Sequence, residues 1–191
     1  MLNRTFIFFI VIFSNFVFTN VSSNDQLNFD ISQIEILDGG NRIIGKKRGK
    51  ITSNNGITIN ADQFEYNKDE NILKASGNIQ IEDKINNYKA SSENIVYLKD
   101  IEKIEIVGKS DFTINSNYNF KSENIIISRK DKIISSDKNT TIIDKENETF
   151  YEIGKFSYSL NSEVLKGENF FINTKYNQPF SDKYYFKTAI F

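Results

Sequence analysis

Apolar and polar residues alternate along almost the whole chain after residue 25. The alternation is regular in 57–61, 64–66, 79–81, 104–106 and 112–114, and a period of two residues is typical of strands with one buried face. No stretch of about 11 residues in this part of the chain keeps apolar residues at the i, i+3, i+4, i+7 spacing of an amphipathic helix. The pattern therefore predicts a chain built almost entirely of β-strands.

Polar clusters separate the alternating stretches and mark the expected turns. Each cluster contains Asn or Asp, whose short side chains hydrogen-bond to the nearby backbone and favour turns. The clusters fall at 67–71, 83–87, 99–100, 115–117, 129–132 and 144–147.

The strands recur with a period of about 30 residues. Ser-Glu-Asn-Ile occurs at 92–95 and again at 122–125. Asp62 lies one period before Glu93, and Gly154 lies one period after Glu123. A second element of the repeat carries a glycine, at Gly77, Gly108 and Gly167, and the third unit has Ser136-Asp137 where the glycine would stand. Glycines inside strands are typical of bulges and bends, so each unit is expected to contain long strands that bend.

This repeat predicts an all-β fold of antiparallel strands. A period near 30 residues with two or three strands is too long for the usual coil of a parallel β-helix and suits a stack of antiparallel strand pairs. The pairs are expected to form two facing, curved sheets, as in an open twisted two-sheet sandwich or a β-jelly roll.

The first 23 residues resemble a secretory signal peptide. Arg4 is the sole charged residue before Asp25, an apolar run begins at Phe6, and small residues end the segment at Val21-Ser22-Ser23. The apolar run is shorter than the roughly 20 residues of a membrane-spanning helix, so cleavage after Ser23 is favoured over an uncleaved membrane anchor. We expect residues 24–191 to form one domain in a bacterial periplasm.

Composition narrows the possible chemistry. The chain contains no His and no Cys, which excludes the usual zinc sites, Ser-His-Asp and Cys-His catalysis, haem ligation through these residues, and disulfides. Lys and Arg number 24 against 25 Asp and Glu, a balance that argues against a dedicated nucleic-acid-binding protein. We expect no cofactor and no metal, and the enzymes that stay possible are those that use carboxylate, Lys or Tyr side chains.

Two motifs resemble the OstA-like family. They read I-x-I-x-A-D-x-F-x-Y-N over 57–67 and L-x-A-x-G-N-I-x-I over 73–81, and the rest of the chain from residue 29 onward follows in phase. This family contains the periplasmic β-jelly-roll domains of the lipopolysaccharide-transport bridge: LptA, LptC and the N-terminal domain of LptD. Residues 150–191 are more similar to the LptD domain, and the resemblance leaves open a free-standing bridge protein or a domain that precedes an outer-membrane barrel.

The resemblance implies a non-enzymatic module that binds the acyl chains of lipopolysaccharide in an apolar groove between two sheets and passes the lipid to the outer membrane. The alternating apolar side chains are the candidates for the groove, although alternation alone fits the closed core of any sandwich equally well. The candidates are Ile57, Ile59, Phe64, Tyr66, Ile79, Ile81, Ile95, Tyr97, Ile104, Ile106, Phe112, Ile114, Phe120, Ile125, Ile127, Phe156 and Tyr158.

The resemblance also implies that the domain joins other jelly-roll domains, and through them the outer-membrane assembly complex, by pairing of edge strands. The first strand is expected at 30–36 and the last at 183–191, preceded by Pro179. The last strand is apolar and aromatic, so it is either an edge that needs a partner or a buried final strand.

Two further readings remain open. A secreted structural or adhesive β-repeat protein would share the signal peptide and strands but have a closed core. A secreted carbohydrate-active enzyme would use paired carboxylates, for which Asp62, Glu93 and Glu123 are candidates, although their periodicity favours a repeated structural role. The basic segment 45–50 is expected to be a solvated hairpin tip, with phosphate binding as the alternative.

Overall fold

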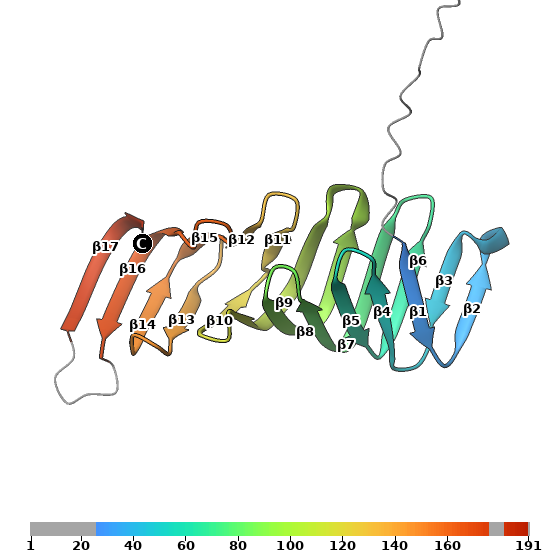
Figure 1. Cartoon of the computed structure of the whole chain (residues 1–191), viewed down its shortest axis with the longest axis horizontal. Coiled ribbons are helices and arrows are strands. Elements are labelled where there is room, and N and C mark those ends of the chain that lie inside the picture. The colour runs from blue at the N-terminus through green and yellow to red at the C-terminus, as the bar shows by residue number, and fades with distance from the viewer. Residues whose placement is uncertain (1–25, 176–181, 191) are drawn as a thin grey trace, which may run out of the picture.

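The computed structural model describes residues 26–175 and 182–190 as a two-layered β-structure (Figure 1). The strands of these ranges form one network of 17 strands, and every pair is antiparallel. Helix in these ranges is limited to two short 3₁₀ segments, η1 (Asp38–Gly40) and η2 (Lys99–Ile101). The all-β antiparallel prediction is confirmed. The expected signal peptide 1–23, Pro179 and Phe191 lie outside the described residues.

The shorter strands belong to one layer each. Layer 1 contains β1 (Leu27–Ile31), β4 (Gly49–Ser53), β5 (Ile57–Ala61), β10 (Tyr118–Glu123), β13 (Thr140–Asp144) and β14 (Thr149–Ile153). Layer 2 contains β2 (Ile34–Leu37), β3 (Arg42–Gly45), β6 (Gln63–Asn67), β11 (Ile126–Ser128), β12 (Ile133–Ser136) and β15 (Lys155–Ser159).

The longer strands bend and take part in both layers. They are β7 (Ile72–Asp83), β8 (Tyr88–Leu98), β9 (Lys103–Ile114), β16 (Leu165–Thr174) and β17 (Asp182–Ile190). In β7, the first half pairs with β6 in layer 2 and the second half pairs with β5 in layer 1. The chain thus passes back and forth between the layers. The bends form one edge of the structure, which we call the corner edge, and the turns between strands form the opposite edge, which we call the turn edge.

Residues with a left-handed backbone mark the bends. Gly77 has φ +77° and Gly108 has φ +82°, a conformation that costs glycine little, so the prediction that these glycines bend long strands is confirmed. In β16 the pairing is interrupted at Asn169, which has φ +57°, and not at Gly167. Gly167 is required for another reason, since a Cβ there would lie 2.4 Å from the carbonyl oxygen of Lys155 on the neighbouring strand.

The expected first strand is wrong in one respect. Residues 30–36 do not form a single strand but belong to β1 in layer 1 and β2 in layer 2, with a corner at residues 32–33. Both layers turn their apolar face to the same interior, but two consecutive polar residues, Ser32 and Gln33, separate Ile31 from Ile34 and shift the alternation by one residue. This interruption falls at the corner where the chain changes layer.

The strands follow one another along the long axis of the molecule, from β1 and β2 at one end to β17 at the other (Figure 1). Side chains of both layers meet in the interior, as in the contact between Phe120 of layer 1 and Phe156 of layer 2, whose ring centroids are 5.5 Å apart. No helix within the described ranges is long and apolar enough to span a membrane.

Candidate functional site

The interior between the layers brings together all the residues predicted for a groove. None of these side chains is more than 7% exposed, and all belong to one hydrophobic cluster. The same cluster includes further residues that the sequence analysis did not single out, although many stand at the same alternating positions: Ile51, Ala61, Leu73, Ala75, Tyr88, Ala90, Ile134, Ile142, Ile153, Leu165, Phe170 and Ile172. The interior is therefore apolar along its length, and whether its residues contact lipid stays a prediction.

Aromatic rings line the middle of this interior. Phe112 stacks on Tyr88 with ring centroids 5.1 Å apart and meets Phe120 edge-on at 6.1 Å. Phe120 also contacts Tyr158 of layer 2 at 6.0 Å. Burial, with the charge of Glu163 nearby, raises the pKa of Tyr158 to about 12, so this hydroxyl stays neutral in ordinary buffers.

The interior reaches solvent at the end of the molecule formed by β2. Ile34 and Ile36 pair with Gly45 and Ile43, which pair in turn with the buried residues Phe64 and Tyr66. Residues paired across antiparallel strands share a face, so both isoleucines lie on the interior face. They are nevertheless 41% and 65% exposed, because in the described residues β2 has a partner on one side only.

The other end, formed by β17, has the same character. Tyr184 and Phe186 pair with the interior residues Ile172 and Phe170 but are 47% and 41% exposed. Their rings lie 6.4 Å apart in a nearly parallel arrangement. In the described residues β17 pairs with β16 alone, so the alternative of a buried final strand is wrong and the expected unpaired edge is confirmed.

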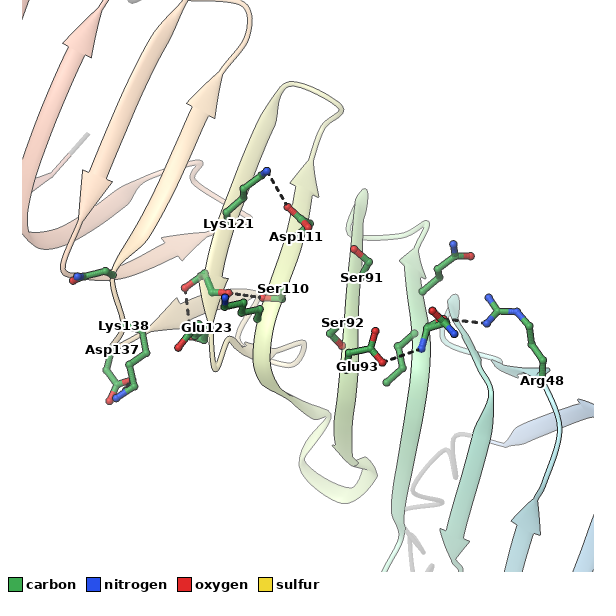
Figure 2. A pocket seen from close by; sticks show the side chains of 16 residues that line it. Arg48, Ser91, Ser92, Glu93, Ser110, Asp111, Lys121, Glu123, Asp137 and Lys138 are labelled. Carbon is green, nitrogen blue, oxygen red and sulfur yellow. Dashed lines mark hydrogen bonds and ion pairs between the residues drawn. The ribbon is translucent and has the colours of Figure 1, made fainter.

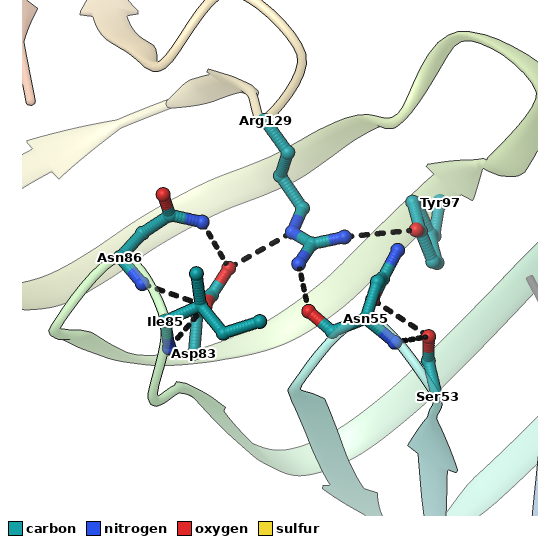
Figure 3. A network of polar contacts seen from close by, with 7 residues as sticks. All are labelled: Ser53, Asn55, Asp83, Ile85, Asn86, Tyr97 and Arg129. Carbon is teal, nitrogen blue, oxygen red and sulfur yellow. Dashed lines mark hydrogen bonds and ion pairs between the residues drawn. The ribbon is translucent and has the colours of Figure 1, made fainter. Parts of the chain in front are cut away.

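A buried arginine joins the two layers at the turn edge (Figure 3). Arg129 lies in the turn between β11 and β12 of layer 2, and its side chain is 4% exposed. Its Nε donates to Oδ2 of Asp83 at 2.9 Å, and its Nη2 donates to the carbonyl oxygen of Asn55 at 2.8 Å. Asp83 and Asn55 both belong to the edge of layer 1, whereas Tyr97 of layer 2 accepts a longer bond of 3.4 Å from Nη1.

Asp83 keeps its charge although its side chain is completely buried. Burial alone raises the pKa of this carboxyl, but hydrogen bonds from the side chain and backbone of Asn86 and the contact with Arg129 together lower it by more, so the net shift is downward. The arginine is ionised as well, because the Asp83 carboxylate outweighs burial and raises its pKa. The group is therefore an ion pair inside an apolar interior.

The turn at 129–132 was predicted from the sequence, but the inward direction of the Arg129 side chain was not. In that segment Arg129 is one of three basic residues beside Asp131, and clusters of this kind usually face solvent. Lys130 and Lys132 do so, as expected. Nothing in the local sequence distinguishes the one side chain that crosses to the other layer.

The three periodic carboxylates lie at the corner edge. Asp62 accepts hydrogen bonds from Asn78 at 2.6 Å and from Arg48 at 2.9 Å. These bonds lower the pKa of Asp62, and the bond from Asn78 has the larger effect. Glu93 accepts a bond of 3.4 Å from the backbone N–H of Asn78. Glu93 and Glu123 line a shallow polar hollow of about 1220 Å³ outside the corner, whereas Asp62 is not among its lining residues (Figure 2).

The lining of this hollow mixes charges of both signs, and Figure 2 shows Lys121 turned toward Asp111 within it. No group of three acidic residues in the described ranges is arranged to hold a metal ion. Asp62 and Glu93 both contact Asn78 at the bend of β7, which agrees with the repeated structural role that their spacing favoured.

The basic segment is exposed to solvent, as expected, but it is not a hairpin tip. It forms the corner between β3 and β4, and most of its charges have carboxylate partners: Lys46 pairs with Glu35, Arg48 with Asp62, and Lys50 with Asp30. The error arises because a corner needs the same glycine and polar residues as a hairpin. Three of the four basic side chains thus have an acidic neighbour, and phosphate binding by this segment stays an untested alternative.

A second hollow, of about 1180 Å³, lies on the outer face of layer 2. Its floor includes Ser135 and Ser157, and exposed apolar side chains border it at Val107, Ile126 and Ile190. This hollow was not predicted from the sequence, because alternation singles out the inward-facing row of each strand.

Comparison with solved structures finds several similar chains. The structure is similar to that of LptH from Pseudomonas aeruginosa, described as the LptA homologous periplasmic component of the conserved lipopolysaccharide transport device. The match has 10% sequence identity and a TM-score of 0.46, and it covers 84% of this chain and 94% of the other. No family model and no curated protein matches the sequence.

Proposed function

We propose that this chain is a periplasmic bridge module for lipopolysaccharide, in which acyl chains travel through the interior between the two layers. The observation that carries the proposal is an apolar interior that runs the length of both layers and ends, on each side, in exposed inward-facing apolar side chains. A closed core would need polar or capped ends. An interior that is to be continued by a neighbour needs ends of the kind seen at Ile36 and Phe186.

The energetic need for such an interior is large. Exposing one methylene group to water costs about 0.8 kcal/mol, so a chain of a dozen carbons costs on the order of 10 kcal/mol. An apolar passage through the periplasm removes most of this cost. The chain needs no enzymatic activity for this role, and the energy for directed movement would come from another protein.

The partners of the module are other jelly-roll domains that add to the unpaired strands. Strand addition supplies backbone hydrogen bonds along an edge and sets the neighbour in a fixed register. With β1 and β2 at one end and β17 at the other, pairing end to end would align the interiors of successive domains. One end of the row would meet the outer-membrane assembly complex, and the signal peptide would place the protein in the periplasm.

Site-specific photo-crosslinking tests the proposal. A photoreactive residue is placed at Phe112, inside, or at its outward neighbour Asp111, in cells that make lipopolysaccharide. We expect lipopolysaccharide adducts at Phe112 and none at Asp111, because alternate residues of one strand face opposite sides. Phe186, at the open end, is expected to yield adducts with lipid or with a second protein chain.

One observation favours the alternative of a structural or adhesive β-repeat protein, namely the complete burial of the predicted groove residues in this structure. That reading predicts no lipid adduct at Phe112, nor at Ile59 or Ile81 in the same assay. Such a result would overturn the transport proposal.

A further inference from the structure

The ion pair between Arg129 and Asp83 is a point where the turn edges of the two layers are tied together through the interior. The two residues are 46 positions apart in sequence and come from different layers. A second contact between the edges, from Asn115 of layer 1 to Glu163 of layer 2 at 3.0 Å, is exposed to solvent. Of these two polar contacts, the one made by Arg129 is buried.

The fold does not require an arginine at this position. In successive repeats the first residue of each layer-2 turn donates its backbone N–H to the preceding turn, with N–O distances of 2.9 to 3.0 Å. These equivalent residues are Lys68, Lys99, Arg129 and Leu160. Lys68 is exposed, Lys99 stays in its own layer beside Tyr66, and Leu160 packs against the core. The chain itself thus shows that leucine is compatible with the position.

Nor does the turn built by Asp83 require a cation. Asp144 occupies the equivalent place in layer 1 and is 2% exposed. Its carboxylate accepts bonds from the backbone of Glu146 and Asn147 and from the side chain of Asn147, as Asp83 does from Ile85 and Asn86. Within the described residues Asp144 forms no ion pair, so the specific contribution of Arg129 is the link between the layers.

A buried ion pair suits a contact that has to open. Removing two charges from water costs much of what their attraction returns, so such a pair often stabilises a fold no more than an apolar contact would. When the edges separate, however, both charges regain their hydration, whereas two apolar side chains would be exposed to water at a cost. A buried ion pair can therefore hold the edges together without making the free energy of separating them too large.

We propose that Arg129 and Asp83 form a releasable latch, which keeps the turn edges together when the interior is empty of lipid and lets the layers part there when it opens. That the latch serves lipid entry rests on the proposed function, because an opening between the turn edges is needed only if the interior takes up lipid. The movement itself is a property of the two layers and can be measured without lipid.

Distance measurements between the layers test the latch. The chain has no cysteine, so Lys84→Cys and Lys130→Cys place spin labels on exposed turns of opposite layers beside the pair. We expect one narrow distance distribution for the protein with Arg129 and an additional population at longer distance in Arg129→Leu, because leucine cannot donate to Asp83 or to the carbonyl oxygen of Asn55 and so leaves no bond between the edges at this point. A second label pair at Lys84 and Lys145, both in layer 1, is expected to stay unchanged.

Asp144→Asn is the matched control, because it disturbs an equivalent buried turn that lacks the arginine. It is expected to leave the distance between the labels at 84 and 130 unchanged. If Arg129→Leu gives the same distribution as the protein with Arg129, or if Asp144→Asn widens it equally, the latch is overturned.

A second experiment keeps Arg129 and therefore does not depend on the folding of a variant. The cysteines at 84 and 130 are joined by a flexible bifunctional maleimide, and uptake of fluorescent lipid A is compared with that of the same protein carrying monofunctional caps. We expect uptake by the capped protein and its loss in the bridged protein. Equal uptake by both would overturn the latch, whereas absence of uptake from both would overturn the proposed function and leave the latch to be decided by the distances.

Discussion

Asp83 combines two roles in one carboxylate. It organises its own turn through Asn86, and it neutralises an arginine that arrives from the other layer. Hydrogen bonds and charge together keep it ionised at complete burial, and its pKa lies below the ordinary value of 3.8. A carboxyl with a lowered pKa in the folded state binds fewer protons than in the unfolded state, so its contribution to stability is present above the unfolded pKa and disappears as the pH falls through the folded one.

We expect Asp83→Asn to lower the free energy of unfolding at neutral pH by about 3 kcal/mol, because it leaves the buried charge of Arg129 without a counter-charge. The difference from the unsubstituted protein should shrink as the pH is lowered below 3.8, since protonation then removes the same charge. Urea unfolding over a pH series measures both effects. Asp111→Asn, at an exposed ion pair, serves as the control and should change little, and a pH-independent difference for Asp83→Asn would contradict the expectation.

At the level of the element, the bent strand is the unit from which the fold is built. β7 and β9 each cross from one layer to the other at a glycine with positive φ. The surroundings of the two glycines differ. A Cβ at Gly77 would lie 2.8 Å from Oδ2 of Asp62, whereas a Cβ at Gly108 would meet nothing within 4 Å.

This difference predicts unequal effects of the same substitution. Both Gly77→Ala and Gly108→Ala place a side chain in a left-handed conformation, which costs about 1 kcal/mol. Gly77→Ala should destabilise more, because it also displaces Asp62 from its hydrogen bonds with Asn78 and Arg48. Urea midpoints of the two variants give the comparison. Equal losses, or a larger loss at Gly108, would show that the Asp62 corner has no role in stability.

The strands could be predicted from sequence because each has one buried face, and burial imposes a period of two on residues such as Ile57 and Ile59. The interior set could be predicted for the same reason. The corner at 32–33 could not be predicted from alternation alone, because the two polar residues Ser32 and Gln33 that interrupt it fit a turn or a bulge as well as a corner between layers. The destination of Arg129 could not either, since it depends on which turn of the opposite layer lies within reach, and that is set by the stacking of strands remote in sequence.

At the level of the whole molecule, stability should vary along the long axis. In repeat-like folds each unit is supported mainly by its neighbours, so units with a neighbour on one side are held less firmly. β8 has partners on both sides in both layers, whereas in the described part of the chain β17 pairs with β16 alone.

Hydrogen exchange should therefore be slowest in β7, β8 and β9 and fastest in β2 and β17. Mass spectrometry of peptides after deuterium labelling resolves this gradient, because local opening free energies range from near zero at frayed ends up to the global value in the core. Protection of β17 equal to that of β8 in dilute protein would contradict the gradient. Strong protection of β17 in concentrated protein that disappears on dilution would instead show that neighbouring molecules cover the ends.

The two open ends are chemically different, with the aliphatic pair Ile34 and Ile36 at one and the aromatic pair Tyr184 and Phe186 at the other. Contact between unlike ends is heterologous, and a heterologous contact that does not close into a ring grows without a built-in limit. A row of such molecules would have a direction, like a filament, and its length would not be encoded in the protein itself. The number of molecules in the row would be decided by whatever caps each end.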